Sequence, residues 1–139
     1  MDNVMNLEFL NKSENEGFAR IAAAAFAATL NPTAAEIAEI KTAVSEAVTN
    51  AIIHGYENSV GMVCLKGKIT GRTVEFTVSD EGWGIADVEK AREPLFTGKP
   101  DMERSGMGFS IMESFMDKVE IKSRLGEGTS VKMTKTIDL

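Results

Sequence analysis

Cysteine is nearly absent from this sequence, and so are the segments that carry a chain into or across a membrane. The single cysteine, Cys64, has no second cysteine with which to form an internal disulfide. The first residues lack the basic start, apolar core and small-residue cleavage site of a secretory signal. No stretch approaches the roughly 20 apolar residues that a membrane-spanning helix needs. We therefore expect a cytoplasmic protein.

Basic residues are in the minority. The 15 lysines and arginines are outnumbered by 21 aspartates and glutamates, which gives a net charge of -6. This deficit argues against a protein that holds nucleic acid through its phosphates, and it suits basic protein partners better. The 139 residues are 43% apolar and 26% charged, so we expect one globular domain spanning residues 1–139.

Helical periodicity marks two segments near the N-terminus. Ser13 and Glu16 have the spacing of a capping box at the start of the first helix. The residues expected to face inward from this helix are Phe18, Ile21, Ala22, Ala25, Phe26 and Thr29. The Asn31-Pro32 pair ends it. Thr33 and Glu36 offer a second capping box. The inward residues of the second helix are expected to be Ile37, Ile40, Val44, Val48, Ala51 and Ile52.

Alternation of apolar and polar residues predicts the strands. A short strand is expected over residues 5–9, and a hairpin is expected over residues 63–78 with a tight turn at Thr70-Gly71-Arg72. A helix over residues 106–116 precedes a closing hairpin over residues 119–133. Residues 86–105 have little periodicity, so we expect a short helix near Val88 followed by a lid over the site.

Glu46 and Asn50 are four residues apart in the second expected helix, so their side chains should project from one face. Asn50 offers a neutral oxygen to a magnesium ion that would also bind nucleotide phosphates. Glu46 is placed to accept the proton of an incoming hydroxyl group in phosphoryl transfer. The alternative for Glu46 is a solvated helix carboxylate. His54 is on the same face but is interpreted as a structural histidine.

Asp80 continues the inward side of the strand that contains Val74, Phe76 and Val78. A buried carboxylate needs a hydrogen-bond donor, and the exocyclic amine of adenine would supply one. The alternative is an aspartate that only caps a turn. Gly82 and Gly84 then allow the backbone to approach a flat ligand closely.

Gly106 and Gly108 open the later helix, where backbone N–H groups attract phosphate oxygens. The segment lacks the Gly-Lys-Ser/Thr ending of a Walker loop, so P-loop chemistry is not expected. Lys99, Arg104 and Ser105 lie in or beside the lid, where they would close over the terminal phosphates. Thr129, at the start of the last strand, is expected to share in binding adenine. The remaining candidate nucleotide contacts, which adjoin the glycines, are Ile85, Met107 and Phe109.

In order along the chain, four motifs resemble the N, G1, G2 and terminal boxes of the GHKL ATPase and kinase superfamily. The motifs are Glu46-x-x-x-Asn50, Asp80-x-Gly82-x-Gly84, Gly106-x-Gly108 and Gly128-Thr129. Within this superfamily, residues 13–20, 45–56 and 103–109 resemble the corresponding runs of the sporulation anti-sigma factor kinases. These longer runs are far more specific than the four boxes.

The resemblance implies an α/β (α+β) sandwich of the GHKL (Bergerat) ATP-binding type, in which helices cover one face of a mixed, mostly antiparallel sheet. It implies a homodimer that uses ATP or ADP with Mg2+, binds a sigma factor when loaded with ATP, and phosphorylates a serine of an anti-anti-sigma factor. Under this resemblance Glu46 is the general base, Asn50 the magnesium ligand and Asp80 the adenine reader. Arg20 would contact the protein partners.

Two other functions remain open at this point. The first is a binding-only switch, in which ATP shapes a docking surface and no phosphate moves to a protein. The second is the same kinase acting on a stress-response sigma factor. A histidine kinase core is disfavoured because no pair of dimerisation helices with a phospho-accepting histidine precedes the nucleotide boxes.

Overall fold

The structure, a computed structural model, describes residues 2–56, 59–82, 108–124 and 126–138. Within these residues five strands form one sheet in the order β1-β2-β3-β5-β4, and every pairing is antiparallel. The strands are β1 (Asn3–Leu10), β2 (Met62–Thr70), β3 (Thr73–Asp80), β4 (Lys118–Arg124) and β5 (Gly128–Thr136). The helices are α1 (Asn15–Ala28), α2 (Ala34–Asn50) and α4 (Gly108–Phe115).

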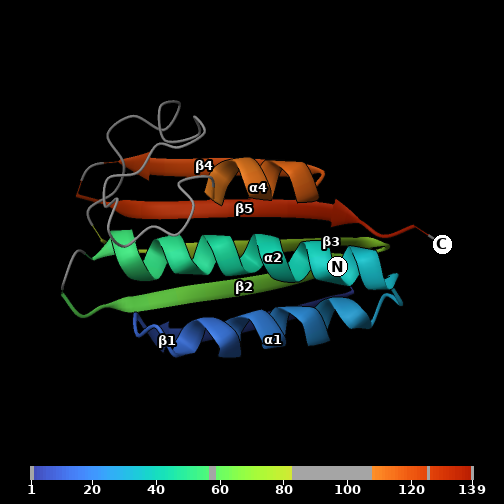
Figure 1. Ribbon diagram of the computed structural model, residues 1–139, viewed down its shortest axis with the longest axis horizontal. Coiled ribbons are helices and arrows are strands. Elements are labelled where there is room, and N and C mark those ends of the chain that lie inside the picture. Colours follow the sequence, from blue (N-terminus) through green and yellow to red (C-terminus); the bar gives the residue numbers. More distant parts are fainter. Residues whose placement is uncertain (1, 57–58, 83–107, 125, 139) are drawn as a thin grey trace.

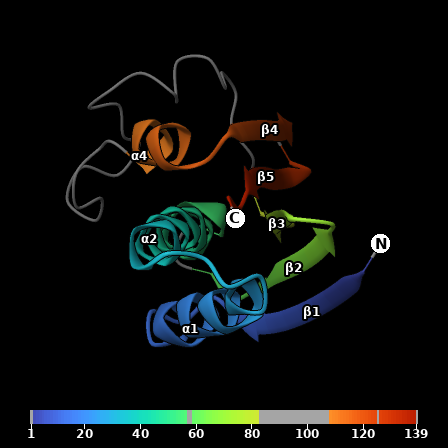
Figure 2. The same ribbon diagram turned by 90° about the vertical axis from the view of Figure 1, so that its right-hand side faces the viewer.

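The three helices lie against one face of the sheet (Figures 1 and 2), which confirms the expected α/β sandwich. Alternate residues of the strands point toward the helices and form one side of the core, as Leu65, Phe76 and Met133 do. The expected hairpins are both present, with Gly71 in the first turn at a φ of 60°. Strand β5 lies between β3 and β4, so the last hairpin places β5 beside the strand that ends at Asp80.

Helix α2 begins and ends close to where the sequence predicted. The Thr33 side chain accepts a hydrogen bond from the Glu36 N–H, and the Glu36 side chain accepts one from the Thr33 N–H, so the second capping box is confirmed. After Asn50 the helix continues as one π-helical segment, η1 (Ala51–Gly55). Such π-helical segments are frequent at functional sites, and this one directly follows Asn50.

The sequence prediction for helix α1 was wrong in its cap and in part of its buried face, although Phe26 packs against the core as expected. The helix begins after Glu14, with no side-chain cap, so Ser13 and Glu16 do not form a capping box. Its buried residues are Ala19, Ala23 and Ala27, whereas Phe18 and Ile21 are 55% and 63% exposed. The small alanines allow α1 to approach α2 closely, and this contact sets the inward face.

Helix α4 buries Phe109 and Met112, as predicted, and begins at Gly108 in the described part of the chain. The expected helix near Val88 and the lid over residues 86–105 lie outside the described residues. Among the described helices none is long and apolar enough to span a membrane.

Candidate functional site

Asp80 is the last residue of β3, and its side chain is on the helix-facing side of the sheet. The alternation that buries Val74, Phe76 and Val78 continues to Asp80, which is only 8% exposed. The expected direction of this carboxylate is therefore confirmed. Its register partner on the neighbouring strand β5 is Thr129.

Backbone groups surround the Asp80 carboxylate. The Gly82 N–H donates a hydrogen bond of 2.9 Å to Oδ1, and the Thr129 N–H also donates to the carboxylate. Burial raises the pKa of Asp80 above its ordinary value, while these two N–H donors oppose part of that rise. A carboxylate that is buried with few donors is suited to accept a hydrogen bond from a ligand.

Gly55 and Gly82 allow the end of η1 to pack directly against Asp80. A β-carbon on Gly55 would lie 2.8 Å from the Asp80 carboxyl carbon. A β-carbon on Gly82 would overlap the Gly55 carbonyl. Neither position has room for a larger residue, so the segment after helix α2 and the turn after β3 form one closely packed unit.

Glu46 and Asn50 project from the same face of α2 toward the start of α4. A β-carbon on Gly108 would lie 3.2 Å from the Glu46 Oε2 and 3.0 Å from the Asn50 Nδ2. Both polar side chains are half-buried. The structure thus brings together a carboxylate, an amide and the first described residue of a helix, as the sequence predicted.

Other predicted residues differ in their surroundings. The Thr129 hydroxyl is 2.8 Å from the Ser123 hydroxyl, so it has a partner within the sheet. Phe109 is 9% exposed and belongs to the core. The predicted contacts at Gly84, Ile85, Lys99, Arg104, Ser105, Gly106 and Met107 lie outside the described residues.

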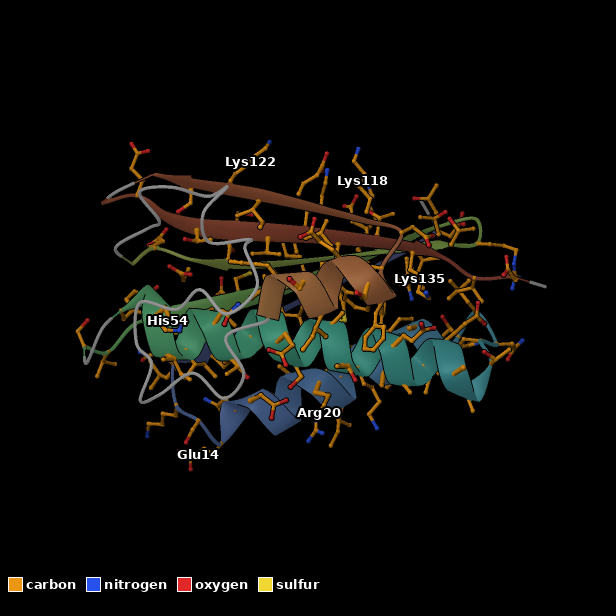
Figure 3. All side chains as sticks on the ribbon, turned by 45° about the horizontal axis from the view of Figure 1, so that its top comes forward. Glu14, Arg20, His54, Lys118, Lys122 and Lys135 are labelled. Atoms are coloured by element: carbon orange, nitrogen blue, oxygen red, sulfur yellow. The ribbon has the colours of Figure 1, made fainter. Side chains whose placement is uncertain are left out.

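Arg20, the expected partner-binding residue, lies on the outer side of α1 (Figure 3). Its guanidinium Nε is 3.3 Å from the Glu16 carboxylate one turn earlier, and the Arg20 side chain remains 41% exposed. The exposed Phe18 and Ile21 are on the same helix. This combination of one cation and two exposed apolar side chains is suited to contact with a protein.

The opposite face of the sheet also has a hollow, of about 390 Å³, at the same end of the strands. Its lining includes Cys64, Ser79, Lys122 and Ser130, whose side chains project away from the helices. Lys118 and Lys122 are seen on this side in Figure 3. The lining also includes Asp80 and Thr129 of the candidate site, whereas Glu46 and Asn50, on the helix side, do not line this hollow.

Sequence reasoning missed two residues beside Asp80, namely Gly55 and Tyr56. The Tyr56 hydroxyl accepts a hydrogen bond of 2.9 Å from the Glu81 N–H and donates one of 2.5 Å to the Met62 carbonyl. The sequence signals were the resemblance of residues 45–56, which includes both positions, and a glycine directly after the second expected helix, which is also common at ordinary helix ends.

The model of the histidine kinase-like ATPase domain family matches residues 10–135 of the chain. The anti-sigma F factor of Thermoanaerobacter sp. (strain X514) is 58% identical over 135 residues, which are 97% of this chain and 94% of that protein. The anti-sigma F factor of Clostridium acetobutylicum is 55% identical over 139 residues, with 100% and 97% coverage. That of Anoxybacillus flavithermus is 59% identical over 136 residues, with 97% and 93% coverage.

Two solved structures have a similar fold. The RsbU and RsbW domains of a Mycobacterium tuberculosis protein match with a TM-score of 0.69 and 19% identity, over 97% of this chain and 32% of that chain. The catalytic domain of the histidine kinase ThkA, in a nucleotide-free form, matches with a TM-score of 0.60 and 21% identity, over 96% of both chains. At these identities the likeness concerns the fold alone.

Proposed function

The chain belongs to the histidine kinase-like ATPase domain family and, within it, to the anti-sigma F factors, and we propose that it is an ATP-dependent regulator with two activities. The first is to bind and inhibit a sigma factor of the F type while ATP is bound. The second is to transfer the terminal phosphate of ATP to a serine of an anti-anti-sigma factor. Protein binding and phosphoryl transfer would both depend on the same nucleotide site.

The observation that carries this proposal is the position of Glu46 and Asn50 against Gly108. The start of a helix attracts phosphate oxygens through its free N–H groups and its dipole. A carboxylate at this place would be repelled by phosphates unless it served the reaction or a cation lay between them. The pairing of Glu46 with Asn50 therefore supports phosphoryl transfer over simple nucleotide storage.

The donors at the site are suited to magnesium. The side chains of Glu46 and Asn50 offer oxygens at the start of α4, and Mg2+ prefers oxygen ligands. Within the described residues no group of three or more His, Cys, Asp or Glu side chains forms a metal cage. This agrees with a cation that takes one or two protein oxygens and completes its shell with phosphates and water. Asn50 would hold the ion, which would neutralise charge on the phosphates.

The positions of three groups support a role for each of them in the reaction. Glu46 would accept the proton of the substrate serine hydroxyl as the hydroxyl oxygen forms a bond to the terminal phosphorus and the bond to the departing ADP oxygen breaks. Asp80, at the far end of η1, would accept a hydrogen bond from the adenine amine. The backbone N–H groups at the start of α4 would face the phosphates.

The remaining parts of the proposal come from the resemblance. The chain would form a homodimer in the cytoplasm as a single domain over residues 1–139, with a lid near 86–105. Lys99, Arg104 and Ser105 would contact phosphates from that lid, while Gly84, Ile85, Gly106 and Met107 would contact the nucleotide. Arg20 would contact the sigma factor and the anti-anti-sigma factor, and the sigma factor would be one of sporulation rather than of stress response.

The test is to incubate the purified protein with terminally labelled ATP, Mg2+ and candidate sigma and anti-anti-sigma factors. We expect label on a serine of the anti-anti-sigma factor and capture of the sigma factor when ATP is present. Glu46→Gln should lower transfer by roughly 100-fold or more while ATP still binds. Glu113→Gln, at an exposed position of α4, is the matched control and should transfer normally.

The rival function is a binding-only switch, and the same experiment separates the two. ATP-dependent capture of the sigma factor with no label on any protein would support the switch. Transfer that is unchanged by Glu46→Gln would contradict the role of Glu46.

A further inference from the structure

Tyr56 connects three segments that meet at the candidate adenine site. It follows η1 directly, is half-buried, and packs against the hydrophobic core. Its hydroxyl donates to the Met62 carbonyl at 2.5 Å and accepts from the Glu81 N–H at 2.9 Å. A β-carbon on Gly61 would overlap the Tyr56 ring, so the ring lies directly on the Gly61 backbone. The phenol is thus held by its ring and by its hydroxyl.

The register of β2 and β3 explains what this hydroxyl does. Val63 opposes Asp80 in the last pair of the ladder, so one further step would place Met62 opposite Glu81. The Tyr56 hydroxyl forms hydrogen bonds with the Met62 carbonyl and with the Glu81 N–H. It therefore takes the place of direct pairing between Met62 and Glu81, so the ladder ends at Asp80 and the chain leaves the sheet at Glu81.

The turn that begins at Glu81 also holds the Asp80 side chain. The Gly82 N–H donates to the Asp80 Oδ1, and Gly82 packs on the Gly55 carbonyl next to Tyr56. Loss of the Tyr56 hydroxyl would leave the Glu81 N–H without this acceptor. The turn at Glu81, which points the Gly82 N–H toward the Asp80 carboxylate, would then be less firmly held. The effect would be transmitted to the Asp80 carboxylate through one backbone turn.

We propose that Tyr56 is a positioning residue that holds the Asp80 carboxylate in the orientation that distinguishes adenine from other bases. The inference rests on the proposed function, in which Asp80 accepts a hydrogen bond from the adenine amine. Tyr56 itself does not contact the nucleotide. Its effect should therefore appear in the choice of base rather than in the binding of the triphosphate.

The experiment measures the affinities of the full chain for ATP and for inosine triphosphate (ITP), with Mg2+, by calorimetry. ITP has the same triphosphate but carries a carbonyl where adenine carries its amine. In the wild type we expect ATP to bind more tightly than ITP. Tyr56→Phe keeps the ring and removes both hydroxyl bonds, and it should weaken ATP binding by about fivefold to tenfold and ITP binding by less than about twofold.

Three further variants make the result specific. Gly61→Ala keeps the hydroxyl but displaces the ring, and it should lower the ATP preference in the same way, so it decides the outcome should Tyr56→Phe not fold. Thr136→Val removes a side-chain hydroxyl contact with Thr73 at the opposite end of β3, and it should leave the preference unchanged. In an Asp80→Asn background, Tyr56→Phe should have no further effect on the ATP-to-ITP ratio.

The outcomes separate this inference from the proposed function. A wild type that binds ATP and ITP equally would overturn the reading of adenine by Asp80, and the role of Tyr56 with it. A wild-type preference that survives both Tyr56→Phe and Gly61→Ala would overturn the role of Tyr56 alone. Equal weakening of ATP and ITP would also overturn it, because that result indicates a general structural effect. Selective loss of ATP binding, absent in the Asp80→Asn background, would establish it.

Discussion

Gly108, the first described residue of helix α4, lies so close to Asn50 of helix α2 that a β-carbon on Gly108 would be 3.0 Å from the Asn50 amide nitrogen. The same β-carbon would be 3.2 Å from the Glu46 carboxylate. Two segments 58 positions apart in the sequence are thereby held with almost no space between them. The absence of a side chain at residue 108 lets the start of α4 reach the polar pair on α2.

Gly108→Ala is therefore expected to displace the Asn50 side chain and to weaken binding of ATP with Mg2+ by roughly tenfold, or about 1.4 kcal/mol. The free energy of unfolding should change little, because alanine is the better helix former and offsets part of the contact strain. Calorimetric titration measures the affinity and urea unfolding the stability. Gly17→Ala is the control, since its β-carbon would lie 3.6 Å from the nearest atom, on Arg20. Equal affinities of Gly108→Ala and Gly17→Ala for ATP would contradict a close contact of Gly108 with Asn50.

Asp80→Asn should weaken ATP binding, because a neutral amide is a poorer acceptor for the adenine amine than a carboxylate. We expect a loss of about 1.5 to 2 kcal/mol, or roughly tenfold to thirtyfold, which is larger than the loss expected for Tyr56→Phe. Calorimetry with ATP measures this loss. Unchanged ATP affinity in the variant would show that Asp80 does not contact the base.

The same variant should change how stability depends on pH. Burial raises the pKa of Asp80 in the folded protein above its value in the unfolded chain. The folded state thus holds this proton more tightly, and the stability that Asp80 contributes is fully present below the unfolded-state pKa and is lost as pH rises through the folded-state pKa. Asp80→Asn lacks this titration. Urea unfolding at a series of pH values should show the variant gaining stability relative to the wild type as pH rises over that range, and a constant difference would contradict the raised pKa.

The sequence predicted where Glu46, Asn50 and Asp80 point because these side chains follow simple periodicities. Glu46 and Asn50 share a face because helical neighbours four apart do, and Asp80 faces the helices because strand alternation extends from Val74. These relations are local, so they hold before any tertiary contact forms. The contact of Gly108 with Asn50 joins distant segments, and only the order of the motifs indicated it.

Two features could not be predicted from local pattern. The inward face of α1 is defined by Ala19, Ala23 and Ala27, while the larger Phe18 and Ile21 face outward. Periodicity gives the spacing of a helix face but not which of two apolar faces is buried, and the choice depended on how closely α1 packs on α2. The role of Tyr56 depends likewise on its tertiary contacts with Glu81 and Met62.

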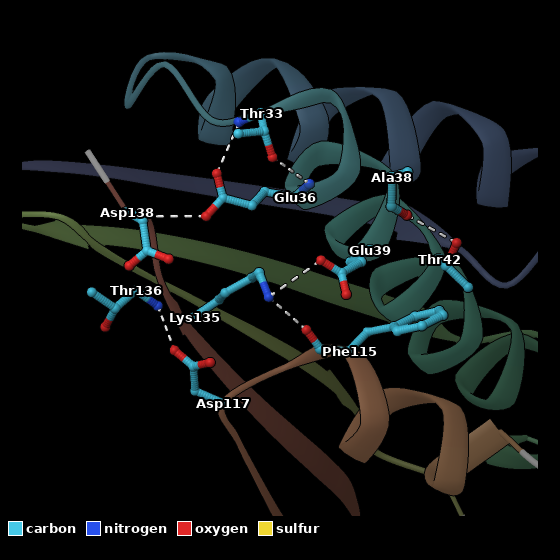
Figure 4. A network of polar contacts seen from close by, with 10 residues as sticks. All are labelled: Thr33, Glu36, Ala38, Glu39, Thr42, Phe115, Asp117, Lys135, Thr136 and Asp138. Atoms are coloured by element: carbon cyan, nitrogen blue, oxygen red, sulfur yellow. Dashed lines mark hydrogen bonds and ion pairs between the residues drawn. The ribbon is translucent and has the colours of Figure 1, made fainter.

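Thr33→Ala removes the capping box of α2, in which Thr33 and Glu36 bond each other's N–H groups (Figure 4). We expect a loss of about 1 kcal/mol in the free energy of unfolding, measured with urea. Thr42→Ala is the control on the same helix. The Thr42 hydroxyl donates to the Ala38 carbonyl, which already lies within the helix, so its removal should be neutral or slightly stabilising. Equal losses in both variants would contradict a special role for the cap.

Lys135 joins the end of α4 to strand β5 and helix α2 (Figure 4). It is 9% exposed, its Nζ donates to the Phe115 carbonyl at 2.8 Å, and Glu39 lies 3.7 Å away. A cation at the C-terminal end of a helix is also favoured by the helix dipole. Lys135→Met keeps the packing of the apolar stem and removes the charge, so we expect a loss of about 1.5 kcal/mol in the free energy of unfolding.

Lys132→Met tests whether this effect depends on the buried position. Lys132 is on the same strand but on the opposite face, where its half-exposed side chain pairs with Glu120 at 3.1 Å. Solvent weakens such a pair, so its loss should lower the free energy of unfolding far less than the loss of the buried Lys135 contacts does. Urea unfolding of both variants gives the comparison. If the two losses were equal, the contact between Lys135 and Phe115 would not hold α4 in place. A larger loss for Lys135→Met would instead indicate that Lys135 of β5 holds the C-terminal end of α4 in place. The N-terminal end of α4 contacts Glu46 and Asn50.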